Sequence, residues 1–532
     1  MAQTPKLIVT GQEARKRLQA GVDKLAEAVV STLGPRGANV ALDRPWGVVD
    51  IIHDGVSVAK EVVLEDPIEN MGAKLVRQAA EKTNDQAGDG TTTATLLAQQ
   101  VVDKGNKAIE EGTNQIFLKR GIDKAKALVS KALTEMATPV KKSDWIKVAT
   151  ISAQDKTIGE KIAEALEMVG EDGLIETDEG ASSEIEVEHS EGMELDKGYT
   201  SNYFATNGET MECVLEKPFI LITDARLSSS TPLLEILKKV NGAGKPLLII
   251  ADNIDGEALQ TLLINKLKGA LQVCVVRTPT FGDDGKSVLE DIAIVTGGTV
   301  ISSDKGFKLE ETSLEQCGIA QRVIVDGSKT KIIGGEGTKE EIEERVRQLK
   351  LQSSKGNEFQ KTRINERIAR LTKGVAIIRV GASTEVELND KKERVKDAVG
   401  ATKAAIEEGI IAGSGISLIF ASKVLDDVKC DTVDEERGVD IVKEALAEPL
   451  RHQIRNSGLN PEKMLKKIMD INDPDMSFNS ETLKVCSMSK AGIIDPVKVA
   501  RLAVENGLSV ASMILTTKCD ITDLPKKDET TR

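Results

Sequence analysis

The sequence predicts a multidomain protein of the α plus α/β class. Its 532 residues exceed what one hydrophobic core can hold, so several domains are expected. Near both ends of the chain, apolar residues recur at the three- and four-residue spacing of amphipathic helices. Between about Gly192 and Gly374, strand-like runs alternate with helical stretches, which is typical of an α/β layer domain. Helical segments therefore flank an α/β domain in the middle of the chain.

The first predicted element is a helix that begins after Thr10. Thr10 and Glu13 have the spacing of a capping box, and an apolar face follows over 18–29. Gly34 and Pro35 should end this helix, because proline offers no amide and glycine tolerates the turn.

Two short β-like runs come next, at 39–42 and 48–52, and Pro45 and Gly47 between them predict a hairpin. Helical periodicity then returns in three further segments, Met71–Glu81, Thr93–Glu111 and Gln115–Ala137.

The middle of the chain contains the predicted strands Phe219–Thr223, Leu247–Ala251, Gln272–Val276 and Thr299–Ile301. Two charged helical segments follow at Lys339–Leu351 and Arg363–Leu371. They could form a coiled-coil arm or a helical hairpin packed on the domain. The hairpin is favoured because the repeat is too short for a coiled coil.

Composition excludes several functional classes. The net charge is 71 − 85 = −14 and aromatic residues make up 2%, which disfavours a nucleic-acid-binding surface. Apolar runs such as 246–251 are much shorter than the about 20 residues of a membrane span, and the first residues lack the pattern of a secretory signal. The six cysteines form no CxxC pair, so neither structural zinc nor a disulfide framework is expected. These features predict a cytoplasmic protein.

The sharpest motif is the octet 88–95, Gly-Asp-Gly-Thr-Thr-Thr-Ala-Thr, which leads directly into an apolar helix. Glycines allow close backbone approach, and free amides at a helix start favour phosphate. Asp89 supplies the hard oxygen that Mg²⁺ prefers. A capped helix start with a polar turn is the alternative. The sequence has neither the GxxxxGK[ST] of P-loop enzymes nor a GxGxxG dinucleotide motif.

Other candidate residues are ambiguous by themselves. The glycine-rich turns at 32–37 and 412–415 could bind phosphate or only end helices. Asp54 and Asp397 could position a water molecule for phosphoryl transfer, or could be ordinary turn and helix-surface residues. The three histidines show no ligand spacing, and no nucleophile signature is present.

Two segments of the middle domain, 231–242 and 256–268, are apolar over an unusually wide arc. Leu234 and Leu237 form a second stripe beside the expected core face, and Leu259 and Leu263 do the same in the next helix. Such helices are either deeply buried or present a hydrophobic groove.

Taken together, these segments resemble the group I, GroEL-like chaperonins from about Lys6 to Pro525. The resemblance rests on many motifs in order, including TLGPRG, HDGVSVAKE, GDGTTTATLLAQ, ATISA, EGMELDKGYTSNYF, KPLLIIADNIDGEAL, GASTEVE, ATKAAIEEGIIAG and IIDPVKVAR.

The resemblance implies three domains. A mainly helical equatorial ATP-binding domain would comprise 1–135 and 408–532, and a small α/β intermediate hinge domain would comprise 136–191 and 375–407. An α/β apical domain at 192–374 would bind polypeptides and a co-chaperonin. Gly192, Gly374 and Gly409 would serve as hinges.

The resemblance also implies the nucleotide site. Asp54 and Asp397 would align the attacking water, with Asp397 arriving only when the intermediate domain swings down. Asp89 would hold Mg²⁺, and Thr32, His53 and Thr92 would hold K⁺. Phe478 falls at a position that holds the adenine and ribose. The remaining nucleotide contacts would come from Thr32, Leu33, Gly34, Pro35, His53, Asp89, Gly90, Thr91, Thr92, Thr93, Ser414, Gly415, Asn479, Ser480, Glu481 and Asp495.

The apical match favours the groove interpretation. The residues that would bind exposed apolar segments of unfolded proteins are Tyr199, Ser201, Tyr203, Phe204, Leu234, Leu237, Leu259, Leu263, Ile264 and Asn265.

The implied function is an ATP-dependent chaperone, a chaperonin ATPase of the isomerase class, working with ATP, Mg²⁺ and K⁺. It would fold polypeptides inside seven-membered homo-oligomeric rings. Its partners would be a second stacked ring and a lid-like co-chaperonin. The alternative is a divergent holding paralogue with little ATP turnover. This sequence departs from the family in having His53 where lysine is usual, Ser414 inside a triple glycine, and no Gly-Gly-Met tail.

Overall fold

The computed structural model describes residues 5–523, except 45–47, 172, 181, 209, 281, 356–357 and 373. The chain divides into two compact units. Unit 1 holds the described residues of 1–164, 177–186 and 379–532, and unit 2 holds those of 165–176 and 187–378. The two ends of the chain thus fold together, and most of unit 2 is an insertion between them.

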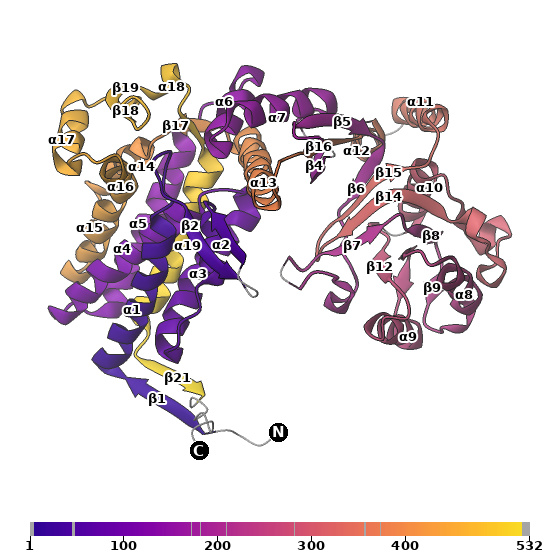
Figure 1. Ribbon diagram of the computed structural model, residues 1–532, viewed down its shortest axis with the longest axis horizontal. Helices are drawn as coiled ribbons and strands as arrows, with labels where there is room; N and C mark the ends of the chain where they lie inside the picture. Colours follow the sequence, from indigo (N-terminus) through magenta and orange to yellow (C-terminus); the bar gives the residue numbers. More distant parts are fainter. Residues whose placement is uncertain are drawn as a thin grey trace. The chain divides into compact units, whose positions relative to one another are not determined.

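Unit 1 is built around a helical bundle with α19 at its centre (Figure 1). Its apolar core consists of Ala, Val, Ile and Leu side chains, because aromatic residues are scarce. The main bundle helices are α1 (Gly11–Val30), α3 (Pro67–Ala87), α4 (Thr91–Glu110), α5 (Gln115–Glu135), α15 (Val433–Ala445) and α19 (Val497–Thr516).

Helix α19 is long and apolar enough to cross a membrane by length and composition, which the sequence analysis did not anticipate. It packs against α3, α4 and α5, and most of its side chains are buried. Its apolar character is therefore that of a core helix in this fold.

Helix α1 starts and stops differently from the prediction. Thr10 is the N-cap residue, but its side chain makes no capping hydrogen bond, so the predicted capping box is wrong. Instead, Thr10 ends a strand, and the amide of Gly11 donates to the carbonyl of Lys518 at 2.9 Å. The helix ends at Val30, before the predicted stop at Gly34.

Smaller elements complete unit 1. The predicted hairpin is confirmed as the antiparallel pair β2 (Val40–Arg44) and β3 (Val48–Ile52). The other two-stranded sheets pair β1 (Lys6–Thr10) with β21 (Cys519–Asp523), β17 (Ile410–Ala412) with β20 (Ile494–Pro496), and β18 (Met476–Asn479) with β19 (Lys484–Ser487). The remaining helices are α2 (Gly55–Glu61), α6 (Lys142–Ala153), α13 (Glu385–Glu408), α14 (Ile416–Ser422), α16 (Glu448–Asn456), α17 (Pro461–Ile471) and α18 (Met488–Ala491).

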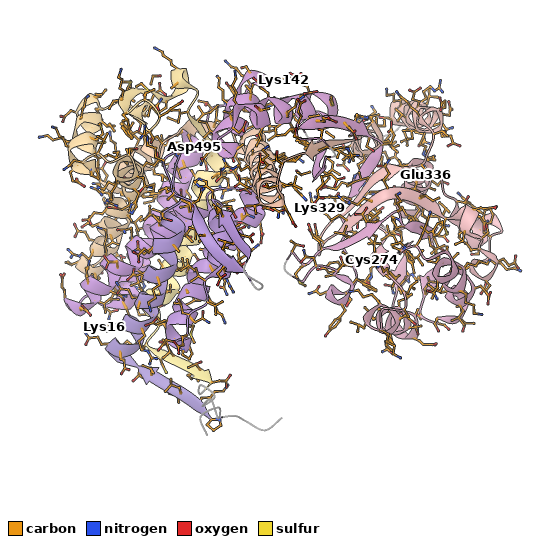
Figure 2. The ribbon with its side chains drawn as sticks, viewed as in Figure 1. Lys16, Lys142, Cys274, Lys329, Glu336 and Asp495 are labelled. Carbon is orange, nitrogen blue, oxygen red and sulfur yellow. The ribbon has the colours of Figure 1, made fainter. Side chains whose placement is uncertain are left out.

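Unit 2 contains an eight-stranded mixed sheet, and Figure 2 labels Cys274 on one of its strands. The strands run in the order β12 (Val273–Arg277), β10 (Leu247–Ala251), β8 (Phe219–Thr223), β14 (Gly318–Val325), β15 (Thr330–Gly335) and β6 (Gly192–Leu195), while β13 (Val300–Ile301) pairs with β8 and β7 (Cys213–Glu216) pairs with β14. Three of these strands are parallel neighbours and almost wholly buried, as their continuous apolar runs predict.

The longer helices described in unit 2 are α8 (Leu234–Ala243), α9 (Gly256–Leu267), α10 (Gly282–Thr296), α11 (Lys339–Lys355) and α12 (Glu358–Thr372). Helices α11 and α12 pack on each other and on α10, which confirms the predicted helical hairpin. Arg345 and Arg367 both bind the buried carboxylate of Asp291 on α10. The two guanidinium groups compensate a charge that would otherwise be costly to bury.

The chain passes between the units where β4 (Leu174–Glu179), β5 (Glu186–Ser190) and β16 (Val375–Val380) form a three-stranded sheet, after α7 (Lys156–Val169). The predicted intermediate segments, 136–191 and 375–407, are divided between the two units. Of the predicted hinges, Gly374 and Gly409 adopt positive φ angles of 60° and 86°. Gly192 does not: it lies in β6, where a side chain would meet the carbonyl of Ile332.

One buried carboxylate makes the β1–β21 pair sensitive to pH. Asp520 lies opposite Val9, and neither of its oxygens has a hydrogen-bond partner among the described residues. Burial raises the pKa of Asp520, although the charge of Arg17 opposes the shift. The folded form therefore binds the proton more tightly than the unfolded chain, and local stability falls as the pH rises above the usual aspartate range.

We expect Asp520→Val to slow hydrogen exchange of the β1 and β21 amides by about tenfold at pH 8, because an unpaired buried polar group costs about 1–3 kcal/mol. Asp520→Asn keeps the shape of the side chain, but the amide does not ionise. This variant should therefore remove the pH dependence of the free energy of opening. An opening free energy in the native protein that is constant from pH 4 to 8 would contradict this account.

Candidate functional site

A cavity of about 240 Å³ lies within unit 1, and segments from both ends of the chain line it. The walls come from the turn after α1, the starts of α2 and α4, the end of α6, and α13. Further walls come from β17, α14, α16, β20 and α19. The cavity therefore exists only because the bundle brings the first 154 residues against the last part of the chain.

The octet at 88–95 forms one wall with the geometry that its glycines predict. Gly88 and Gly90 both have left-handed backbones, with φ of 70° and 86°, and Gly90 is the N-cap residue of α4. A side chain at Gly88 would lie 2.7 Å from Gly400 on α13. This close approach of two glycines holds α13 against the octet, so Asp397, one turn earlier on α13, also lines the cavity.

Asp89 projects from the octet and is held by two hydrogen bonds. Its Oδ1 accepts from the Gly90 amide at 2.5 Å, and its Oδ2 accepts from the Ser152 hydroxyl at 3.0 Å. Burial raises the pKa of Asp89, and the nearby charge of Asp54 raises it further. A buried carboxyl whose anion is destabilised in this way is suited to bind a cation.

Two other carboxyls in the cavity are perturbed in the same direction. Burial raises the pKa of Asp397 well above its ordinary value, and the charges of Asp54 and Asp89 add to the effect. Burial and the charge of Asp89 raise the pKa of Asp495 to about 7. Figure 2 labels Asp495 at the end of the bundle away from β1 and β21. Such a set of coupled acids is typical of a functional site.

Asp54 is fixed by a structural role that its sequence position did not reveal. It is the N-cap residue of α2, and its oxygens accept from the amides of Val56 at 3.2 Å and Ser57 at 2.7 Å. The cap orients this carboxylate at the cavity wall.

Asp89 is the predicted metal ligand of this cavity. Among the residues that the structure describes, no three His, Cys, Asp or Glu side chains lie close enough together to hold a metal ion. Asp89 could hold a divalent cation only together with oxygens of a bound ligand, which is how Mg²⁺ is usually held beside phosphates.

The structure brings most of the predicted nucleotide residues together. Those that line the cavity are Thr32, Leu33, Gly34, His53, Asp54, Asp89, Gly90, Thr91, Thr92, Thr93, Asp397, Gly415 and Asp495. Asp397 lines the cavity in this structure, and its predicted arrival with a swing of the intermediate domain stays a prediction.

Six predicted contacts do not line the cavity: Pro35, Ser414, Phe478, Asn479, Ser480 and Glu481. The Ser414 hydroxyl donates to the carbonyl of Phe478 at 2.7 Å, and Phe478 is wholly buried in a neighbouring cluster.

The side chain of Asn479 is used within its own turn, where it accepts from the amides of Glu481 and Thr482. Arg36 ties this turn to the 32–37 turn by donating to the carbonyl of Ser480 at 2.6 Å. These residues therefore support the cavity wall in this structure.

Sequence reasoning missed four polar residues that line the cavity: Ser152, Gln154, Ser417 and Gln453. Ser152 belongs to the ATISA motif, so its position was visible as part of the resemblance, but its bond to Asp89 was not. Gln154 and Gln453 carried no signal in the sequence.

Unit 2 presents the second predicted site, on α8, α9 and the short helix η2 (Asn202–Phe204). Helices α8 and α9 follow the paired parallel strands β9 (Arg226–Leu227) and β11 (Asn253–Ile254), so they begin side by side. Lys266 on α9 donates to the carbonyls of Tyr203 and Ala205, which ties η2 to α9.

The exposed fractions of these side chains distinguish those that face solvent from those that pack in the core of unit 2. Tyr203, Leu234 and Ile264 are 67%, 42% and 50% exposed, and Leu267, which the sequence analysis left out of the site, is 64% exposed. The leucines of the second stripes, Leu237, Leu259 and Leu263, are half-buried against the core, as is Tyr199. Ser201 caps η2, and Asn265 donates to the carbonyl of Thr261.

Phe204 corrects the prediction. Its side chain is wholly buried in the core of unit 2, so it is not accessible to a bound polypeptide in this conformation. The aromatic pair Tyr203–Phe204 is split because consecutive residues of a short 3₁₀ helix point in different directions, and only Tyr203 faces outward.

Comparison with known proteins shows the family of the chain and a solved structure with a similar fold. A family model described as the TCP-1/cpn60 chaperonin family matches residues 25–523. The fold is similar to that of the chaperonin gp146 from the bacteriophage EL 2 (Pseudomonas aeruginosa), whose crystal structure was determined in the presence of ATP-BeFx. The TM-score is 0.68 at 22% sequence identity, and the match covers 96% of this chain and 98% of that one.

Proposed function

Because the chain belongs to the TCP-1/cpn60 chaperonin family, we propose that it is an ATP-dependent molecular chaperone, with ATP hydrolysis in the unit 1 cavity and capture of non-native polypeptides on unit 2. The observation that carries the proposal is the convergence of Asp54, Asp89 and Asp397 beside a glycine-threonine turn at a helix start.

The cavity suits a nucleoside triphosphate. The free amides at the start of α4 and the hydroxyls of Thr91, Thr92 and Thr93 would bind the phosphates. Asp54 and Asp397 would orient the attacking water, since phosphoryl transfer needs mainly alignment. Bound Mg²⁺ would neutralise phosphate charge beside Asp89, and K⁺ would lie near the carbonyls of Thr32 and His53.

The exposed apolar side chains of α8, α9 and η2 support the capture of unfolded chains. Contiguous apolar surface binds exposed hydrophobic segments without sequence specificity, at about 25 cal/mol per Å² removed from water. We further propose that the same surface takes a lid-like co-chaperonin, and that the working form is a seven-membered ring, stacked in pairs.

The proposal is tested by refolding an aggregation-prone enzyme with ATP and a co-chaperonin while phosphate release is measured. ATP-dependent recovery of activity is expected. Suppression of aggregation without ATP hydrolysis would instead identify a holding protein.

The exposed apolar side chains of α8, α9 and η2 lead to a separate prediction. The triple variant Tyr203→Ser, Leu234→Ser and Ile264→Ser should weaken binding of a fluorescent unfolded polypeptide by about tenfold or more, because three exposed apolar contacts are lost.

The matched control replaces Val63, Val424 and Val433, which are exposed valines of unit 1, with serine. Equal affinity losses in the two triple variants would show that unit 2 holds no special capture surface.

A further inference from the structure

The His53 ring is held between two amide side chains at the cavity wall. Its Nδ1 lies 3.1 Å from Oδ1 of Asn39, and its Nε2 lies 3.2 Å from Nε2 of Gln154. The Asn39 oxygen can only accept, so Nδ1 carries the hydrogen. The His53 Nε2 is then free to accept from the Gln154 amide, which assigns both hydrogen bonds to one neutral tautomer.

These bonds join elements that are distant in sequence. Asn39 precedes β2 and His53 follows β3, so both belong to the base of the hairpin. Gln154 is the C-cap residue of α6, in a left-handed conformation with φ of 53°. The bond therefore links the hairpin to the end of α6.

The end of α6 also contacts Asp89 and the helix that carries Asp397. Ser152 donates to Asp89, two residues before Gln154. The carbonyl of Ala153 accepts from Nη1 of Arg394 at 3.4 Å, and Arg394 lies on α13 one turn before Asp397. Arg394 is itself braced by Asp390 at 2.8 Å.

We propose that His53 and Gln154 form a latch, a pair of positioning residues that holds the end of α6, and with it α13 and Asp397, in register over the cavity. The inference rests on the proposed ATPase function and deepens it. Neither side chain needs to touch the reacting atoms.

The latch is tested with a double-mutant cycle in the full-length chain. His53→Phe keeps a planar ring without nitrogens, and Gln154→Met keeps the length of the side chain without the amide. Each variant should lower kcat for ATP by about tenfold with KM within about twofold, because misplacement of a water-orienting group affects the transition state more than binding. The double variant should lose no more than either single variant.

A second readout does not depend on turnover. Hydrogen exchange of the amides at 151–154 should accelerate in both single variants. His53→Gln, which restores an acceptor, should recover part of the kcat loss. Gln12→Met removes a similar exposed amide bond, from Gln12 to Glu110, and is the matched control.

Multiplicative losses in the double variant, a rise in KM without a fall in kcat, or unchanged exchange at 151–154 would each overturn the latch. If the native chain hydrolyses no ATP, the proposed function fails by itself, and the exchange measurement still decides whether the two residues hold α6.

Discussion

Asp397→Ala is expected to lower the turnover number for ATP by about 100-fold or more while ATP still binds. Positioned carboxylates that orient or activate a nucleophile contribute about 10²–10⁴ in rate. Asp397 lines the cavity from α13, whereas the proposed phosphate-binding turn lies at the start of α4, so the loss of the Asp397 carboxylate leaves that wall intact. Single-turnover hydrolysis and equilibrium ATP binding, measured in parallel, separate the two effects.

The control for this variant is Glu407→Ala on the same helix. Glu407 forms an exposed ion pair with Lys498 and lies outside the cavity lining. Its turnover should match the native protein within about twofold, since exposed ion pairs contribute little. A native rate in Asp397→Ala would remove Asp397 from the mechanism.

Asp89→Asn is expected to weaken Mg²⁺-dependent ATP binding by about 100-fold, because the amide cannot replace a carboxylate as a ligand for a hard cation. The same change should stabilise the nucleotide-free protein. Burial and Asp54 raise the pKa of Asp89, so the folded state favours the protonated acid and loses stability as the pH rises above the aspartate range. The side-chain amide introduced by Asp89→Asn is uncharged, so its burial does not cost stability as the pH rises.

Titration calorimetry with and without Mg²⁺ measures the first effect, and thermal unfolding of the nucleotide-free protein between pH 5 and 8 measures the second. Asp85→Asn, on an exposed turn of α3, is the matched control. The account fails if Asp89→Asn binds Mg²⁺ and ATP as the native protein does, or if it is less stable than the native protein above pH 7.

Much of the fold could be predicted because its signals are local. The strands Phe219–Thr223 and Leu247–Ala251 have the predicted bounds, and the hairpin at β2 and β3 follows from two β-like runs with a turn between them. The octet at 88–95 leads directly into a helix, as predicted, because α4 begins at Thr91. In each case the physical cause lies within a few residues of chain.

The errors arose where tertiary contacts replaced local ones. Thr10 has capping-box spacing, yet the strand pair β1–β21 supplies the partner for the helix start. Phe204 is adjacent to exposed Tyr203 and is nevertheless buried.

By itself, the sequence determined the helix and strand periods, the glycine-rich turn before α4 and the resemblance to the chaperonins, because each depends on residue types at short spacing. The packing of the bundle places Asp54, Asp89 and Asp397 in one cavity, Ser152 against Asp89 and Gln154 against His53. These residues lie on different helices and turns, and their separation in space is set by how the bundle packs, which no local pattern encodes.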